Sequence, residues 1–428
     1  MTIKQSTILK SNAVRRWIGG AIHDTHTLKS NALRRWIGGA IHDPPPYVRR
    51  SWGGLVGQLV GLSLAATLLV GQEPGNSHAE PKTLSLGAPA PEFDLPDVDG
   101  QRYSLKDFAA AKVLVVVFTC NHCPTAQAYE QRIIDLQRDY SDKGVALVAI
   151  SPNDPLAVRL DELGYSDLGD SLEEMQLRAH QREFKFPYLF DGETQRASAA
   201  YGVLATPHVY IFDAERRLQY VGRIDDNEVK PPSSHDARNA IDQLLAGQPV
   251  AIPQTRVFGC STKWADKRPS AVESLAKWNK ESAELSAIAP ADLHQQLTGK
   301  SENYRLVNVW ATWCIPCIEE LDELVTMHRM YRGREFELIT VCADDVANKD
   351  KALKVLSDKH CSARNFILET STQDELFDSV DPQWQGAVPY TMLVAPSGEV
   401  LHRVHGELDP LELKRVIVEH LGRTYAPH

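Results

Sequence analysis

Two pairs of cysteines with the same spacing are the residues of this sequence best suited to do chemistry. Cys120 and Cys123 lie in T-C-N-H-C-P, and Cys314 and Cys317 lie in W-C-I-P-C-I. A C-x-x-C pair can be a zinc half-site, a structural disulfide or a redox catalyst. Zinc needs further ligands, and neither pair has a second C-x-x-C or an H-x3-H at the spacing of a zinc finger. We therefore expect redox chemistry at both pairs and no metal.

The segments on either side of each pair favour a redox role over a static disulfide. An apolar run precedes each pair, at 112–118 and at 305–311, and a stretch with helical spacing follows it. This order predicts the first cysteine at a helix N-terminus, where unpaired N–H groups and the helix dipole stabilise a thiolate. A static disulfide does not need a helix start. We predict Cys120 and Cys314 as the attacking cysteines and Cys123 and Cys317 as the resolving ones.

Two similar α/β units surround the pairs. The first is predicted to contain a hairpin turning at 99–100, a strand at 112–118, a helix from Cys120 to Tyr140, a strand at 145–150, an acidic helical insertion, an antiparallel hairpin and a helix ending near 246. The second repeats the pattern with strands at 305–311 and 336–342, helices at 315–331 and 347–359, a hairpin at 391–406 and a last helix. Strand, helix and strand in this order predict parallel pairing.

Short motifs in both units resemble known redox families. Residues 82–265 resemble the AhpC/TSA-type redoxins through F-T-C-N-H-C-P, A-T-P-H-V-Y, G-R-I-D-D-N and F-G-C-S-T-K-W. Residues 289–423 resemble the TlpA/ResA branch of exported thiol–disulfide oxidoreductases through N-V-W-A-T-W-C-I-P-C and A-V-P-Y-T-M-L-V. The resemblance implies an α/β fold with two thioredoxin-like domains, each a central mixed sheet flanked by helices. Residues 266–288 would then be the linker between them.

The resemblance also implies a proline loop facing each pair. The two loops are Thr206-Pro207 and Val388-Pro389, with the peptide bond before each proline in the cis form. No cofactor is implied, because the redox-active groups are the disulfides Cys120–Cys123 and Cys314–Cys317.

Three further residues are predicted to support the sites. Glu320 stands where TlpA-like helices carry a glutamate, and it is either a proton acceptor or a solvated side chain. Trp313 precedes the second pair. His122 lies inside the first pair, where a protonated ring would stabilise the thiolate and make the disulfide more oxidising. We therefore expect a lower pKa for Cys120 than for Cys314, and electrons flowing from the second pair to the first.

Two departures from the families matter. Thioredoxin carries a buried Asp six residues before its first cysteine, and here those positions are Leu114 and Asn308. Peroxiredoxins use P-x-x-x-T-x-x-C, and counting back from Cys123 gives Cys120 at the Thr position and Val116 at the Pro position. A thiol peroxidase recycled by its own C-terminal domain is therefore the alternative function. A non-catalytic redoxin scaffold that binds an exported protein is a third hypothesis.

The N-terminal residues 1–79 are predicted to be a leader. Arg49 and Arg50 precede 51–72, which has no charge, and Ser77 and Ala79 suit a signal-peptidase site. The uncharged stretch is almost long enough to anchor the chain in a membrane. Residues 9–24 recur nearly unchanged at 28–43, which we interpret as a duplication. We expect export to the periplasm or cell envelope.

Charge and the remaining cysteines limit the partners. The chain has a net charge of −10, although residues 1–72 are basic, and an acidic body does not suit nucleic acid. The expected partners are exported proteins with thiols or disulfides and a membrane or periplasmic electron donor. Cys260, Cys342 and Cys361 are predicted to be buried thiols that do not pair with one another.

Overall fold

The computed structural model describes residues 82–369 and 373–425. The predicted leader lies outside these residues, so its export signal, its membrane anchor and its repeat stay predictions. None of the helices in the described ranges is long and apolar enough to cross a membrane.

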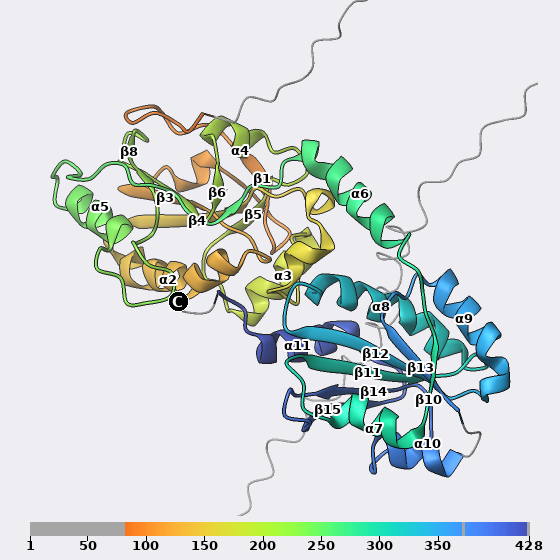
Figure 1. The fold of residues 1–428 in the computed structure, drawn as a ribbon. Coiled ribbons are helices and arrows are strands. Elements are labelled where there is room, and N and C mark those ends of the chain that lie inside the picture. Colours follow the sequence, from red (N-terminus) through yellow and green to blue (C-terminus); the bar gives the residue numbers. More distant parts are fainter. Residues whose placement is uncertain (1–81, 370–372, 426–428) are drawn as a thin grey trace, which may run out of the picture. The chain divides into compact units, whose positions relative to one another are not determined.

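The first domain, residues 82–265, is built on a five-stranded mixed sheet (Figure 1). Its elements are β1 (Asp94–Pro96), β2 (Arg102–Ser104), β3 (Val113–Phe118), α2 (Pro124–Tyr140), β4 (Val145–Ser151), α3 (Leu172–Gln181), β5 (Tyr188–Phe190), α4 (Arg196–Tyr201), β6 (Ala205–Thr206), β7 (His208–Phe212), β8 (Leu218–Gly222), α5 (Asp236–Leu245) and β9 (Cys260–Ser261). The strand order is β5–β4–β3–β7–β8. β3, β4 and β5 are parallel, whereas β7 and β8 run antiparallel to their neighbours.

Both faces of the central strand β3 are buried, which explains its continuous apolar sequence. Val115 and Val117 pack on one face against side chains of α2, α3 and α5. Leu114 and Val116 pack on the other face against the β1–β2 hairpin and α4. The strand therefore holds the cysteines that follow it at a fixed place on the sheet edge.

The second domain is built on a six-stranded mixed sheet with the order β10–β13–β12–β11–β14–β15. Its elements are β10 (Ser286–Ile288), α7 (Pro290–Thr298), β11 (Tyr304–Trp310), α8 (Ile315–Tyr331), β12 (Phe336–Cys342), α9 (Lys349–Asp358), β13 (Arg364–Leu368), α10 (Gln373–Val380), β14 (Tyr390–Val394), β15 (Val400–His405) and α11 (Pro410–Leu421). Leu306 and Trp310 of β11 pack against α8, α9 and α11, and Val307 and Val309 pack against α7 and α10. Helices thus cover both faces of this sheet.

Most predicted elements are present, with two corrections. The first helix begins at Pro124 and not at Cys120, because Pro124 occupies its first turn and Cys123 is its N-cap. The strand Ser286–Ile288 lies in the segment predicted as a linker, yet it pairs with β13 and extends the second sheet. The rest of that segment contains the helix α6 (Arg268–Trp278).

Candidate active sites

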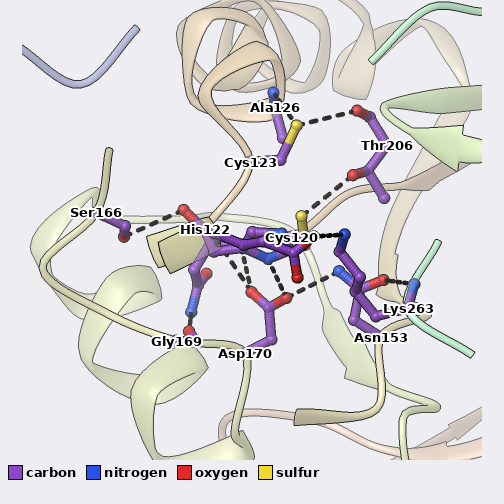
Figure 2. Close-up of polar contacts among 12 residues, drawn as sticks. Cys120, His122, Cys123, Ala126, Asn153, Ser166, Gly169, Asp170, Thr206 and Lys263 are labelled. Atoms are coloured by element: carbon purple, nitrogen blue, oxygen red, sulfur yellow. Dashed lines mark hydrogen bonds and ion pairs between the residues drawn. The ribbon is translucent and has the colours of Figure 1, made fainter. Parts of the chain in front are cut away.

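The first cysteine pair lies between the end of β3 and the start of α2, next to the proline loop (Figure 2). The Thr206–Pro207 peptide bond is cis, as the resemblance implies. The Sγ of Cys120 lies 3.1 Å from the Oγ1 of Thr206, and the Sγ of Cys123 lies 3.4 Å from the carbonyl oxygen of Thr206. One residue of the loop therefore contacts both sulfurs.

Helix α2 directs its N-terminal donors to Cys123 and not to Cys120. The backbone N–H of Ala126 donates to the Sγ of Cys123 at 3.4 Å. Both cysteines are buried, Cys120 at 5% and Cys123 at 0% exposure. The sulfur that receives the helix N–H group is therefore the second of the pair, contrary to the role predicted from spacing.

A buried ion pair lies beside the first of these cysteines. The Nδ1 of His122 lies 2.6 Å from the Oδ2 of Asp170, and both side chains are almost fully buried. Burial alone would lower the pKa of His122, but the charge and hydrogen bond of Asp170 raise that pKa above its usual value. Burial would raise the pKa of Asp170, but His122 holds it below its usual value. Asp170 thus favours the protonated form of His122 inside the motif.

The two thiols of the first pair have opposite pKa shifts. Burial, the hydrogen bond with Cys123 and the charge of Asp170 raise the pKa of Cys120 well above its usual range. Burial would also raise the pKa of Cys123, but hydrogen bonds from Cys120 and Cys260, together with the charge of His122, hold that pKa well below its usual range. These shifts favour the thiolate on Cys123 over Cys120, and the comparison of Cys120 with Cys314 stays a prediction, because Cys314 is in a disulfide.

Cys120, His122 and Asp170 also form a group whose ligand atoms lie within 4.8 Å of one another. The carboxylate of Asp170 is already fully engaged. Its Oδ1 accepts from the backbone N–H groups of Asn121 and His122, and its Oδ2 accepts from the Nδ2 of Asn153 besides pairing with His122. We interpret the group as an ion pair beside a thiol.

The second pair is a disulfide, Cys314–Cys317, at the start of α8. Cys314 is the N-cap of this helix, and its Sγ accepts from the backbone N–H of Cys317 at 3.3 Å. The Val388–Pro389 peptide bond is cis, as the resemblance implies. Trp313 and Ile315 flank the pair and are 65% and 71% exposed. Large apolar side chains in such an exposed position suit contact with another protein.

Glu320 lies one turn after Cys317 on α8 and is a buried carboxyl group. The Nδ2 of Asn308 donates to its Oε1 at 2.8 Å, so the residue at the position of the missing Asp holds the glutamate in place. Burial raises the pKa of Glu320 to about 7. Of the two interpretations of this residue, the geometry favours the proton acceptor, because a solvated carboxylate would keep an ordinary pKa.

The remaining cysteines are free, and one of them has an unexpected place. Cys342 and Cys361 are buried in the core of the second domain and do not pair. Cys260, in contrast, is only half-buried, so the prediction of a buried thiol is wrong for it, and it packs against the cluster of Cys120, Cys123 and Ala126. Neither Cys260 nor Asp170 was expected at this site, because both come from segments more than 45 residues away in the chain from the motif they contact. The tail F-G-C-S-T-K-W was the only signal for the former.

Comparisons with known proteins agree with this geometry. The profile of the AhpC/TSA family matches residues 86–221 and 282–403, which together are more than half of the chain. The thioredoxin-like protein YneN of Bacillus subtilis is 27% identical over 146 residues, covering 34% of this chain and 76% of that protein. The Mycobacterium tuberculosis protein Rv2521, whose name proposes a peroxiredoxin, is 31% identical over 144 residues, covering 29% of this chain and 90% of that protein.

Two solved structures are also similar. The hypothetical protein SMc02350 from Sinorhizobium meliloti is 33% identical, with 43% of this chain and 97% of that chain covered and a TM-score of 0.39. An uncharacterized conserved protein from Geobacillus kaustophilus is 38% identical, with 42% and 92% covered and a TM-score of 0.38.

Proposed function

Because the chain belongs to the AhpC/TSA family, whose redoxin fold supports an oxidoreductase activity, we propose that it is a thiol–disulfide oxidoreductase with two C-x-x-C centres. One observation carries the proposal. Each pair lies between a central strand and a helix N-terminus, and in the first domain Thr206 of the proline loop contacts both sulfurs. This arrangement stabilises a thiolate and holds a second sulfur ready to resolve a mixed disulfide.

The centres would act on partner proteins in the following way. A thiolate attacks the partner's disulfide, one partner sulfur leaves as a thiol, and the second cysteine of the pair displaces the other, so that the pair is oxidised and the partner reduced. In the second domain Glu320 would take the proton from the resolving thiol of Cys317. We propose exported proteins as the partners, a membrane or periplasmic donor as the electron source, and the periplasm or cell envelope as the location.

Reduction of insulin by the full chain tests the activity. Cys123→Ser and Cys314→Ser should each remove one site, and the double variant should be inactive, whereas Cys342→Ser serves as a matched buried control. A double variant with full activity would contradict the proposal. N-terminal sequencing of the mature protein tests the location, and Glu80 or a neighbouring residue is the expected first residue.

A thiol peroxidase is the second candidate, because Cys123 is the N-cap of α2 and its sulfur receives a helix N–H group, an arrangement that favours a thiolate there. Cys123 is also the position from which the peroxiredoxin motif is counted, although Cys120 and Val116 replace its Thr and Pro. Peroxide consumption with a dithiol as the reductant, and trapping of a sulfenic acid on Cys123 with dimedone, test this function. A sulfenic acid on Cys123 without insulin reduction would favour the peroxidase.

A further inference from the structure

The edge of the first proline loop is covered by the domain's own tail. β6, which ends at Thr206, pairs antiparallel with β9, so that Thr206 lies opposite Cys260 and Ala205 opposite Ser261. An extended peptide that adds to an exposed strand edge is a common mode of partner binding. Here the chain itself supplies that strand, and it carries a cysteine at the position next to the redox pair.

The second domain has no such cover in its described residues. No strand there pairs with the residues before Pro389, and exposed Trp313 and Ile315 flank its disulfide. The two sites therefore differ in how a partner sulfur can reach them. Among the described residues, only the first site has a strand, β9, that pairs with its proline loop.

Gly259 allows the tail to approach the loop so closely. Its φ of +139° is a conformation that other residues rarely adopt, and a Cβ added there would lie 2.0 Å from the carbonyl oxygen of Thr206. After Cys260 the tail is fixed by Lys263, whose backbone N–H donates to the Oδ1 of Asn153 at 2.9 Å. Asn153 in turn donates to Asp170. The position of Cys260 is thus held on both sides.

Cys260 contacts the reacting sulfurs directly. It packs against the cluster that Cys120 and Cys123 form with Ala126, and it lies opposite Thr206, the loop residue that contacts both sulfurs. It is half-buried, whereas the other two are buried. Cys123 therefore has two neighbouring thiols with which it can form a disulfide, Cys120 and Cys260. Cys260 is the more accessible of the two.

We propose that Cys260 is a third redox thiol of the first site, presented to Cys123 on a strand that takes the place of a partner peptide. When Cys120 and Cys123 are joined, the sulfur of Cys260 attacks the Sγ of Cys123. The Cys120–Cys123 bond breaks, a Cys123–Cys260 bond forms, and the proton of the Cys260 thiol passes to Cys120. The number of disulfides is unchanged, so the step needs no outside oxidant. The half-buried disulfide that results is the one that exchanges with partners.

This inference rests on the proposed function for the first oxidation of the pair, and a disulfide map separates the two. The full chain carrying Cys314→Ser and Cys317→Ser is equilibrated in a glutathione redox buffer, quenched with acid, alkylated and digested with trypsin. Cys120 and Cys123 lie in peptide 113–132 and Cys260 lies in peptide 257–263, so a Cys123–Cys260 bond links two peptides. A Cys120–Cys123 bond stays within one.

Adding Cys120→Ser should convert the first site to the linked peptides. Adding Cys120→Ser with Cys260→Ser should abolish the link and leave Cys123 as a mixed disulfide with glutathione. Adding Cys120→Ser with Cys361→Ser, a buried thiol of the second domain, should leave the link unchanged. Circular dichroism of each variant checks that the fold is kept, and Cys260→Ala should behave as Cys260→Ser does.

Each outcome decides one of the two claims. Glutathione on Cys123 in the Cys120→Ser variant, with no linked peptides, would overturn the role of Cys260. Insulin reduction at an unchanged rate when Cys260→Ser is added to the Cys314→Ser, Cys317→Ser protein would overturn it as well, and both results leave the proposed function intact. Linked peptides in a protein that does not reduce insulin would support the three-thiol exchange and reject the proposed function.

Discussion

Asp170 and His122 form a buried ion pair, and its removal should have a large effect on stability. Asp170→Asn leaves a buried histidine without its counter-charge, and breaking a buried pair in this way costs about 3–5 kcal/mol of unfolding free energy. Denaturant unfolding of the full chain measures the loss. Asp94→Asn is the matched control, because Asp94 pairs with Arg102 on the surface and an exposed pair contributes at most about 1 kcal/mol.

The pH dependence gives the same prediction a second readout. The raised pKa of His122 contributes stability that is present below its usual 6.5 and is lost as pH rises through the folded-state pKa. The lowered pKa of Asp170 contributes stability that is present above its usual 3.8 and is lost as pH falls through the folded-state pKa. The difference between wild type and Asp170→Asn should therefore be largest between these values. A difference that does not change with pH would mean that the pair is not ionised.

Glu320 should make the second domain less stable as pH rises. Its pKa is about 7 when folded and near 4.5 when unfolded, so the unfolded chain gives up its proton first. Between pH 5.5 and 8.5 this difference removes about 2 kcal/mol of unfolding free energy, at 1.36 kcal/mol per pKa unit. Glu320→Gln should abolish that slope, and denaturant unfolding at the two pH values measures it. An unchanged slope in the variant would show that Glu320 has an ordinary pKa.

At the scale of the elements, the strand β9 depends on a single glycine. Gly259→Ala combines a backbone conformation that costs about 1–3 kcal/mol for other residues with a collision against the Thr206 carbonyl. We expect β9 to leave β6, so that amide hydrogen exchange in peptide 257–263 becomes faster. Gly247→Ala is the control, because Gly247 also has a positive φ, +69°, but has open space around it. Equal exchange in the two variants would contradict the close approach.

The sequence predicted the elements with strong patterns and missed the shortest ones. The runs ending at Phe118 and Trp310 are buried on both faces, so their apolar sequences identified them as central strands. The apolar spacing placed the start of the first helix at Cys120, which is too early. Pro124 is the true first residue of α2, because proline suits the first turn of a helix. β6 and β9 have two residues each and carry no periodicity. Their pairing depends on the tertiary fold.

The same limit applies to the sites. The C-x-x-C pairs and the proline loops lie in local motifs, and the structure places Thr206 beside the sulfurs as the resemblance implies. The partner of His122 could not be predicted, because Asp170 lies in an insertion with several other Asp and Glu residues, and nothing in the sequence distinguishes it from them. Which cysteine holds the thiolate depends on that partner and on the helix start. Spacing alone therefore favoured Cys120, whereas the helix N–H of Ala126 donates to Cys123.

At the scale of the whole molecule, the two centres should differ in reduction potential. Each centre has a helix N–H donor on one sulfur, from Ala126 in the first and from Cys317 in the second, but in the first the charge of His122 and neighbouring thiols also stabilise the thiolate of Cys123. The second has no charged side chain inside its motif, which contains Ile315 and Pro316. Because a stabilised reduced form makes a disulfide more oxidising, we expect the first centre to have the higher potential and to receive electrons from the second.

Glutathione titration of two full-length variants measures the ordering. Cys314→Ser with Cys317→Ser reports the first centre, and Cys120→Ser with Cys123→Ser reports the second. The negative charge of Asp170 opposes the effect of His122, but the neighbouring thiols stabilise the thiolate of Cys123 and have no counterpart in the motif of the second centre, so the sign should hold. About 30 mV corresponds to a tenfold change in the equilibrium constant, which the titration resolves. His122→Pro should lower the potential of the first centre toward that of the second. Equal potentials in the two variants, or a higher one in the second centre, would reject this direction of electron flow.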